Sequence, residues 1–358
     1  MSDTGMTEDV LIRREGHAGF LSLNRPKAIH ALTLPMVHAM TAALLEWRDD
    51  PAVSVVIIDH AEGRGFCSGG DIAFLRNSAL NDGGVSGRRF FHDEYQLNHL
   101  IFTYPMPVVA FMDGITMGGG VGISQPARFH VATENTRYAM PETGIGLFPD
   151  VGGGWYLSRL PGRIGQFLAL TGARLDGAEC KWAGLATHYL PHDALAEAKA
   201  RIAQGHEPGQ VLSALSATPP EARIAGNAPK IAKHFASDRY EDILASLAAD
   251  DSAWAAKELA TLRTKSPQTC KVALRQLRDS LSCADFAANM AMEYRIGSRV
   301  LTLPDFAEGV RAVIVDKDNA PVWNPATPEG VTEDLIDSIF APLPDAEEWQ
   351  PLKHTPSP

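Results

Sequence analysis

The chain has 358 residues, a formal net charge of −11 and a sequence pI near 5.5. Because 45% of its residues are hydrophobic, it can bury a sizeable core. The acidic balance argues against a general nucleic-acid or anionic-membrane surface, where a basic face is expected. No apolar run reaches the roughly 18 residues that span a bilayer, so we expect neither a nucleic-acid partner nor a membrane partner.

The first residues and the cysteines bear on location and redox state. The N-terminal stretch MSDTGMTEDVLIRREG has neither a secretory apolar core nor the Arg-rich, acid-poor character of a transit peptide, which predicts a cytoplasmic protein. His188 and His192 are four residues apart, but Pro191 lies between them and disrupts a helical metal site. No disulfide framework or metal site is indicated by the scattered cysteines, which are Cys67, Cys180, Cys270 and Cys283.

Strands and helices are predicted to alternate in the first part of the chain. Apolar-rich runs at 10–14 and 18–23, separated by Glu-Gly-His, predict a β-hairpin. The apolar spacing over 34–47 predicts a helix, whereas the polar, glycine-containing stretch 77–88 predicts a mobile loop. Buried strands are predicted at 53–59 and 107–112, and one more strand is predicted at 128–133.

Helices dominate the predicted structure after about residue 159. The segments there are rich in Ala, Leu and Glu and are broken by prolines. We therefore expect a core with the functional site over 1–210, a helical region over 211–342 and an extended tail over 343–358.

Two glycine-rich stretches follow predicted strands. GRGFCSGGDIAFL follows the strand at 53–59, and ITMGGGVGIS follows the strand at 107–112. A glycine turn that opens a helix leaves backbone N–H groups without partners, and these can bind an anion or a developing oxyanion. The second stretch lacks the GxGxxG spacing of a dinucleotide site. Cys67 stands where a nucleophile elbow has serine, so it is either a nucleophile or a buried core thiol.

Acidic and basic side chains mark candidate pocket positions. Glu142 and Asp150 lie among apolar residues in YAMPETGIGLFPDVGGGWY, where a buried carboxyl would have a raised pKa suited to proton transfer. They form a pocket wall, or they are N-capping acids on ordinary loops. Glu94 lies on a partly apolar helix, where an exposed acid is the simpler interpretation. Arg25 and Lys27 in NRPKAIHAL contact a ligand or are solvated.

Taken in order, GRGFCSGGDI, MDGITMGGGVGIS and AMPETGIGLFPDVGGG resemble the crotonase, or enoyl-CoA hydratase/isomerase, superfamily. The resemblance extends to NRPKAIHAL, LALTGARLDGAECKWAGLATHYL and DFAEGVRAVIVDKDNAPVWNP, and so covers nearly the whole chain. It implies an α/β fold, a spiral of ββα units followed by a helical C-terminal region. It also implies an acyl-CoA ligand, with coenzyme A as part of the substrate and no separate cofactor, and a homo-oligomer, a trimer or a hexamer.

The resemblance also implies roles for particular residues. Gly70 and Gly119 correspond to the two N–H donors that hold the thioester oxygen, and Gly119 also contacts the substrate. Glu142 corresponds to the catalytic acid, which attacks the thioester itself or takes a proton from a water. Asp150 and Glu94 correspond to further acidic pocket positions of the hydrolase branch. The expected contacts with coenzyme A are Arg25, Lys27, Ser68, Gly70 and Lys317.

One departure from the family bears on the reaction class. Hydratases that resemble this chain use two glutamates, and Gly122 stands at the first of those positions, while Asp150 stands where they have glycine. We therefore expect hydrolysis of a short 3-hydroxyacyl-CoA such as 3-hydroxyisobutyryl-CoA or 3-hydroxypropionyl-CoA, as in valine catabolism. The alternatives are an enoyl-CoA hydratase or isomerase, and a non-catalytic acyl-CoA- or RNA-binding module. His30 replaces the usual asparagine of NRPKxxNAL, which affects the local loop.

Overall fold

The computed structural model describes residues 7–353. Its strands form two sheets, with strand order β1-β2-β3-β5-β7-β10 in the larger and β4-β6-β8-β9 in the smaller. The strands are β1 (Val10–Glu15), β2 (Ala18–Leu23), β3 (Val55–His60), β4 (Gly65–Cys67), β5 (Val108–Met112), β6 (Ile115–Met117), β7 (Phe129–Ala132), β8 (Arg137–Ala139), β9 (Leu175–Asp176) and β10 (His188–Tyr189). The predicted hairpin, the two predicted buried strands and the further strand predicted at 128–133 are confirmed.

The two sheets grow together along the chain. The chain passes from β3 to β4, from β5 to β6 and from β7 to β8, each time adding one strand to the larger sheet and the next to the smaller, before a helical segment follows. Neighbouring strands of this series pair in parallel in both sheets. This is the expected spiral of ββα units, and the predicted fold class is confirmed.

Helices fill the segments between and after the strands. They are α1 (Leu34–Arg48), α2 (Ile72–Asn81), α3 (Val85–Phe102), α4 (Gly119–Ser124), α5 (Gly153–Ser158), α6 (Ile164–Thr171), α7 (Gly177–Ala183), α8 (Leu195–Ala203), α9 (Pro208–Leu215), α10 (Ala228–His234), α11 (Tyr240–Ala248), α12 (Ala253–Leu262), α13 (Pro267–Ser280), α14 (Phe286–Val300), α15 (Pro304–Val310) and α16 (Glu333–Phe340). Shorter 3₁₀ or π segments are η1 (Pro26–Ala28), η2 (Glu142–Ile145), η3 (Pro161–Arg163), η4 (His192–Ala194), η5 (Arg223–Asn227), η6 (Arg311–Val315) and η7 (Pro328–Gly330).

The prediction of a mobile loop over 77–88 is wrong. Helix α2 continues to Asn81 and α3 begins at Val85, so only a short turn separates them. Gly83 and Gly84 make this turn with φ values of 66° and 79°, which glycine adopts at little cost. The Ser78 hydroxyl donates to Asp82 and accepts from the Gly87 N–H, tying the two helices together. The polar side chains of this stretch therefore stabilise a turn between two helices.

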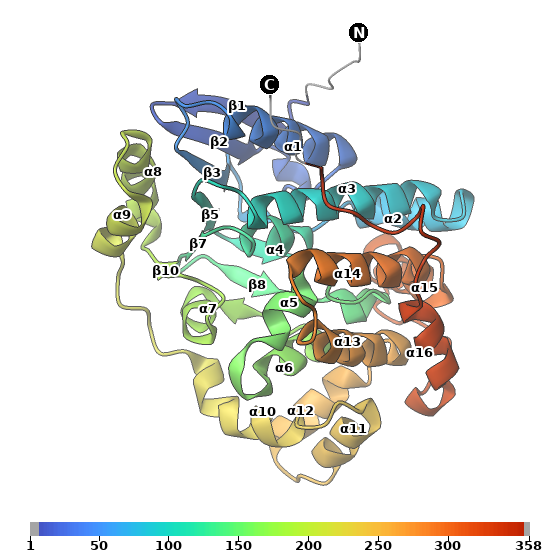
Figure 1. The fold of residues 1–358 in the computed structure, drawn as a ribbon. Helices are drawn as coiled ribbons and strands as arrows, with labels where there is room; N and C mark the ends of the chain where they lie inside the picture. Colours follow the sequence, from blue (N-terminus) through green and yellow to red (C-terminus); the bar gives the residue numbers. More distant parts are fainter. Residues whose placement is uncertain (1–6, 354–358) are drawn as a thin grey trace.

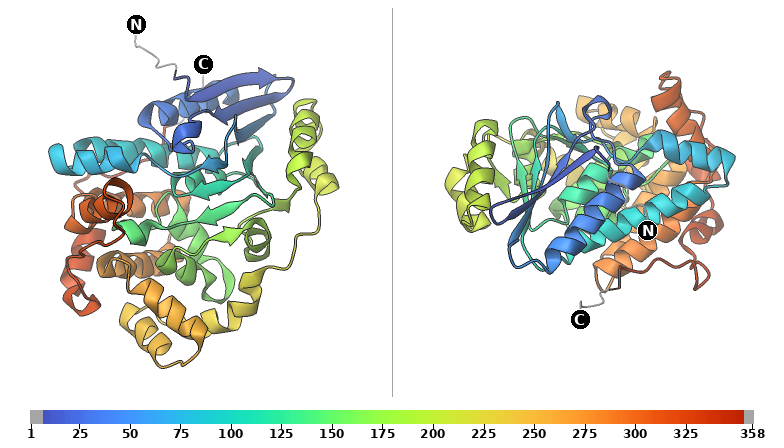
Figure 2. Two further views of the ribbon diagram at one scale, coloured as in Figure 1. Left: turned by 180° about the vertical axis from the view of Figure 1, so that it is seen from behind. Right: turned by 90° about the horizontal axis from the view of Figure 1, so that it is seen from above.

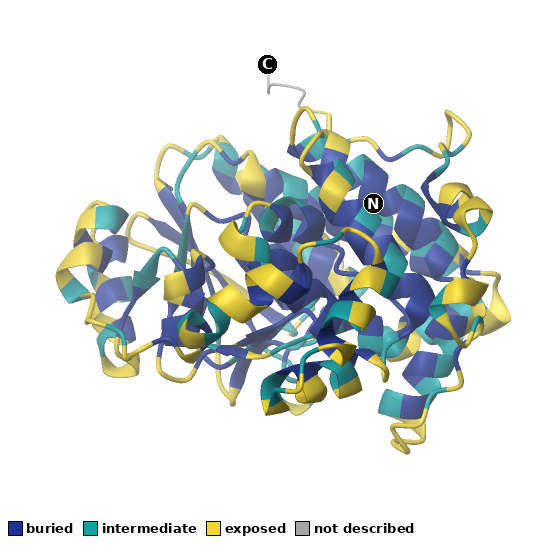
Figure 3. Ribbon diagram, turned by 90° about the horizontal axis from the view of Figure 1, so that it is seen from below, coloured by how far each residue is buried: buried dark blue, intermediate teal, exposed yellow. Residues whose placement is uncertain are grey.

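The larger sheet separates two apolar clusters because its strand side chains alternate between its faces. Val55 and Ile57 pack in the cluster that includes α8 and α9, and Val56 and Ile58 pack in the main core with α1 and α3. Figures 1 and 2 show α8 and α9 alone on one side of the strands and the remaining large helices on the other. Buried residues fill the middle of the molecule, and exposed residues lie on outer loops and on the outward-facing sides of helices (Figure 3).

The C-terminal helices pack back onto the ββα core. Helix α14 lies against α3, and α13 lies against α5 and α6 (Figure 1). The division of the chain near residue 210 stays a prediction, and that position falls inside α9. Within residues 7–353, no helix combines the length and apolar character of a membrane span.

The end of the chain was expected to be an extended tail over 343–358. Its described part, 343–353, forms neither helix nor strand and lies on the surface of the helices. Trp349 is buried there and its Nε1–H donates to the His92 carbonyl, and Arg295 pairs with Glu348 at 2.8 Å. Residues 354–358, like residues 1–6 of the N-terminal stretch, lie outside the described part.

Candidate active site

A cavity of about 70 Å³ lies between the glycine-rich stretches and the acidic segment. It combines backbone amides, carboxyl groups and an apolar wall, and a volume of this size holds a few small groups or waters. The residues predicted for the site that line it are Ser68, Gly70, Glu94, Gly119, Glu142 and Asp150. Its apolar wall consists of Ile72, Leu75, Phe90, Phe91, Met117, Ile145, Leu147 and Val151.

The two predicted N–H donors lie close together. Gly119 opens α4, and a side-chain carbon placed on it would lie 3.2 Å from the Gly70 nitrogen. Hydrogen bonds from Leu32 N to Gly69 O and from Asp71 N to Leu32 O hold the backbone around Gly70. Among the described residues, neither the Gly70 N–H nor the Gly119 N–H donates to a partner. Both are therefore available to a carbonyl oxygen, as an oxyanion hole requires.

Glu142 and Glu94 bring carboxyl groups to the same place. Glu142 is the first residue of η2 and is 4% exposed, and its Oε1 would lie 3.3 Å from a side-chain carbon on Gly118. Glu94 on α3 is 2% exposed, and its Oε1 would lie 2.6 Å from such a carbon on Gly119. Glu142 Oε2 and Glu94 Oε1 are buried without a hydrogen-bond partner in the described residues. Glu94 is therefore a pocket acid, and the interpretation of an exposed helix acid is wrong.

Asp150 is held by a residue for which the sequence predicted no role. It is 5% exposed, and its Oδ2 accepts a hydrogen bond of 2.8 Å from the Tyr95 hydroxyl. Tyr95 follows Glu94 on α3 and is completely buried. No residue pattern distinguishes this tyrosine from an ordinary core aromatic, because its partner is 55 positions away.

Burial dominates the electrostatics of the three acids. Burial raises the pKa of Glu142 well above its usual value, and repulsion from Asp150 raises it further. The same two causes, in the same order, raise the pKa of Glu94. Burial raises the pKa of Asp150, and the hydrogen bond from Tyr95 opposes this. Since neighbouring carboxylates in a dry pocket do not all ionise together, the cluster retains protons while part of it is ionised.

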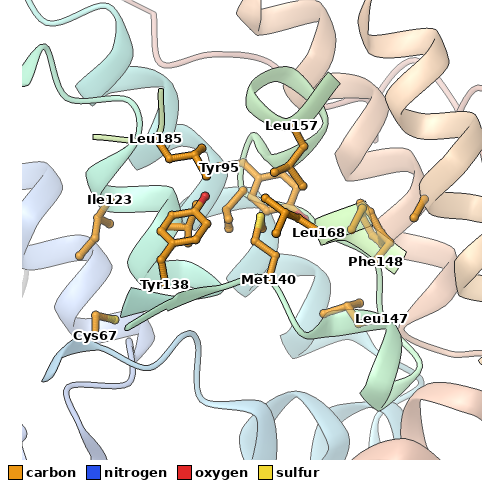
Figure 4. Packing of buried hydrophobic residues seen from close by; sticks show 14 of the residues in the cluster. Cys67, Tyr95, Ile123, Tyr138, Met140, Leu147, Phe148, Leu157, Leu168 and Leu185 are labelled. Carbon is orange, nitrogen blue, oxygen red and sulfur yellow. The ribbon is translucent and has the colours of Figure 1, made fainter. Parts of the chain in front are cut away.

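The alternative nucleophile, Cys67, belongs to the core. Its side chain is completely buried in the apolar cluster shown in Figure 4 and does not line the cavity. Its Sγ donates to the carbonyls of His30 and Gly69, and burial raises the pKa of the thiol to about 12. The thiolate required for nucleophilic attack is therefore disfavoured.

Gly122, where hydratases have their first glutamate, has no space for a side chain. A side-chain carbon there would lie 2.6 Å from Val151 Cβ and 2.9 Å from Asn98 Nδ2. Because Val151 directly follows Asp150, the loop that presents Asp150 also fills the space that a side chain at 122 would need.

The residues predicted to contact coenzyme A are less closely grouped. Ser68 lines the cavity, but its N–H donates to the Ile29 carbonyl and its hydroxyl to the Ala28 carbonyl. Arg25 Nη1 donates to the Ala31 carbonyl, and Lys27 is exposed on η1. Lys317 is exposed in the loop after η6 and does not line the cavity. These contacts stay predictions. In the described part of the chain, no His, Cys, Asp or Glu group is arranged to hold a metal ion.

Comparison with known proteins agrees with this architecture. Residues 18–340 match the family described as enoyl-CoA hydratase/isomerase, and the chain belongs to that family. Among curated proteins, it is 43% identical to the mitochondrial 3-hydroxyisobutyryl-CoA hydrolase of Xenopus laevis, over 93% of this chain and 89% of that protein. It is 39% identical to the human protein of the same name, over 95% of this chain and 90% of that protein.

Two solved structures share the whole architecture. A carnitinyl-CoA dehydratase from Mycobacterium thermoresistibile is 40% identical, with a TM-score of 0.91, and the match covers 96% of this chain and 99% of that one. An enoyl-CoA hydratase from Rhodobacter sphaeroides is 38% identical, with a TM-score of 0.90, covering 96% of this chain and 100% of that one. The similarity therefore includes the C-terminal helices as well as the ββα spiral.

Proposed function

We propose that the protein hydrolyses a short 3-hydroxyacyl-CoA thioester, with 3-hydroxyisobutyryl-CoA as the first candidate substrate. The observation that carries this proposal is the buried Glu142 carboxyl beside two backbone N–H groups without partners, with a glycine at position 122. The curated relatives named 3-hydroxyisobutyryl-CoA hydrolase support it, because they match this chain over nearly its full length.

The proposed reaction begins with the thioester carbonyl oxygen accepting hydrogen bonds from Gly70 and Gly119. These donors stabilise the negative charge that develops on this oxygen as the carbonyl carbon is attacked. The ionised Glu142 either attacks that carbon, giving a mixed anhydride that water then hydrolyses, or takes a proton from a water that attacks directly. Both routes consume one water, break the carbon–sulfur bond and release the free acid and coenzyme A.

Asp150 and Glu94 bind the acyl group in this proposal. Tyr95 occupies Oδ2 of Asp150, which leaves Oδ1 for the attacking water or for the hydroxyl of the substrate. Glu94 contacts the end of the acyl chain beside Gly119. Coenzyme A itself extends from the cavity past Ser68 toward Arg25, Lys27 and Lys317, and all four remain proposed contacts.

The test is thiol release from 3-hydroxyisobutyryl-CoA, followed colorimetrically, for the wild-type protein and for Glu142→Gln. Glu142→Gln keeps the side-chain shape but cannot act as nucleophile or base, so kcat should fall by ~10³-fold or more. Cys67→Ala is the control and should retain turnover, since the thiol lies outside the cavity. Equal turnover in Glu142→Gln and wild type would reject the role of Glu142. 3-Hydroxypropionyl-CoA lacks one methyl group, and its kcat/KM should differ from that of 3-hydroxyisobutyryl-CoA by ~10–200-fold at most.

A hydratase or dehydratase is the second candidate, because the two similar solved structures carry those names. In that case crotonyl-CoA would lose its conjugated absorbance without thiol release. Binding of acyl-CoA without any turnover would instead indicate a non-catalytic module.

Assembly and location are separate proposals. We expect a homo-oligomer, a trimer or a hexamer, from the resemblance to the family, and light scattering of the purified protein tests it. A cytoplasmic location is likewise proposed from the sequence, whereas the curated relatives are named mitochondrial proteins. Cell fractionation distinguishes these locations.

A further inference from the structure

Glu293 is a completely buried acid outside the cavity. It belongs to α14 and lies on the apolar face that includes Phe286, Met290 and Val300. Burying a carboxyl group among such residues costs free energy unless hydrogen bonds satisfy it. Its contacts therefore identify what the acid does in this position.

Both carboxyl oxygens of Glu293 bind the backbone that follows Asp150. The Gly152 N–H donates to Oε2 at 2.7 Å, and the Gly154 N–H donates to Oε1 at 3.0 Å. Asn289, one turn earlier on α14, donates from Nδ2 to Oε1 at 2.9 Å. The carboxyl group thus accepts from these three N–H donors and connects α14 to the loop of Asp150.

Gln276 on α13 holds the same loop on its other side. Its Nε2 donates to the Pro149 carbonyl at 2.7 Å and to Glu293 Oε1 at 3.0 Å. The backbone before Asp150 and the backbone after it are therefore both attached to the C-terminal helices. We call Gln276 and Glu293 the loop clamp.

The loop needs such support because its backbone is strained. Val151 has a φ of 53°, which is unfavourable for a β-branched residue. Conformations of this kind persist only where the surrounding contacts enforce them, and they occur at functional sites. The loop clamp supplies such contacts on both sides of Asp150 and Val151.

We propose that Glu293 is a positioning residue that holds Asp150 in place for hydrolysis. It does not line the cavity, and its hydrogen bonds reach Asp150 through the backbone of 150–154. This inference rests on the proposed function, because its main readout is thiol release.

The experiment is a double-mutant cycle with Glu293→Gln and Asp150→Asn. Glutamine keeps the shape of Glu293, but its amide nitrogen cannot accept from one of the two loop N–H groups. We expect kcat to fall by ~10–10²-fold, the scale of a small misplacement of a catalytic group, with KM within about 2-fold of wild type. In the Asp150→Asn background the same change should lower kcat by less than about 2-fold, since there is no carboxylate left to position.

Glu258→Gln is the matched control. Glu258 is a buried carboxyl group on α12 that does not line the cavity, so its replacement should leave kcat within about 2-fold in both backgrounds. An equal loss of kcat from Glu293→Gln with and without the Asp150 carboxylate would overturn the proposal, because it would show a general structural role. Wild-type kcat in Glu293→Gln would overturn it as well. If Glu293→Gln does not fold, Gln276→Ala, which releases the Pro149 carbonyl, replaces it in the same cycle.

Hydrogen exchange separates this inference from the proposed function. Followed by mass spectrometry, the amides of 150–156 should exchange at least ~10-fold faster in Glu293→Gln than in wild type and Glu258→Gln, without a matching change in β8. If the wild type releases no thiol, the proposed function fails, while faster exchange in 150–156 still supports the clamp. Unchanged exchange in that segment would overturn the clamp whatever the activity.

Discussion

The cavity has two polar walls besides its apolar one, and these two are supported in different ways. One consists of the backbone amides of Gly70 and Gly119, which the ββα spiral places through strand pairing and a helix start. The other consists of carboxyl side chains on the segment 142–154, which the C-terminal helices hold from behind. Ser266 N donates to the Thr143 carbonyl there, and the loop clamp holds the backbone on both sides of Asp150.

The difference shows which changes each wall tolerates. The amide wall depends on the space around glycines, so it is sensitive to the smallest added side chain. The carboxyl wall depends on distant hydrogen bonds and on the protonation of buried acids. We therefore expect different effects from three kinds of variant. Changes in the amide wall should lower kcat, changes where the walls meet should lower stability, and changes in the acids should alter the pH dependence of stability.

The largest of these effects is expected for Gly119→Ala. The added methyl group would lie 2.6 Å from Glu94 Oε1 and 3.2 Å from the Gly70 nitrogen, so it displaces the second N–H donor. Loss of one such donor lowers kcat by ~10²–10³-fold. Thiol-release kinetics measure it, and Gly226→Ala is the control, because within residues 7–353 no atom beyond the adjacent residues lies within 4 Å of the new methyl group. Activity within about 2-fold of wild type would contradict the assignment of Gly119.

A smaller effect, on stability, is expected where the two walls meet. Gly122→Ala places a methyl group 2.6 Å from Val151 Cβ, and overpacking of this kind costs ~1–3 kcal/mol of unfolding free energy. Val151→Gly in the same chain should recover part of this, because it removes the opposing carbon and glycine accepts the φ of 53°. Chemical denaturation measures both variants. Absence of recovery would identify Asn98 as the controlling contact.

The smallest and most specific effect is the pH dependence of Asp150→Asn. Burial raises the folded-state pKa of Asp150 above its unfolded value near 4, so the folded state binds the proton more tightly. Wild-type stability is therefore lost as pH rises from about 4 through the folded pKa, and asparagine removes this loss. The gain in unfolding free energy from Asp150→Asn should grow over that window, by about 1.4 kcal/mol per pH unit at most, and then level off.

For Asp82→Asn, the same measurement should give a change in unfolding free energy with the opposite dependence on pH. Hydrogen bonds from Ser78 and Ser86 lower the pKa of Asp82 to about 2. Its stabilisation is present above pH ~4 and is lost as pH falls toward the folded pKa, so Asp82→Asn should be destabilising at pH 7 and neutral in acid. A pH-independent difference between Asp150→Asn and wild type would show that Asp150 titrates alike in the folded and unfolded states.

The strands and the glycine-rich helix starts could be predicted because they depend on local residue patterns. Alternating or continuous apolar runs specify buried strands, and glycine next to a helix start specifies N–H groups without partners. The sequence also places Glu293 as an acid on the apolar face of a helix, but it does not indicate that its partners are the N–H groups of Gly152 and Gly154. The prediction of a mobile loop over 77–88 is wrong because the Ser78 hydroxyl binds the Asp82 carboxylate and the Gly87 N–H across a turn, which composition does not reveal.

Residue patterns alone predict the strands, the glycine-rich helix starts and the acids Glu142 and Asp150 as candidates for the chemistry. The resemblance to the family adds the spiral of ββα units and Gly70 and Gly119 as the two expected amide donors. The folded arrangement was needed to show that Glu94 is buried, that Tyr95 holds Asp150 and that Gly122 has no room for a side chain. These contacts were hidden because their partners are far apart along the chain. The contact of Gly152 with Glu293 joins residues 141 positions apart, and such contacts depend on how whole elements pack and leave no mark in either local pattern.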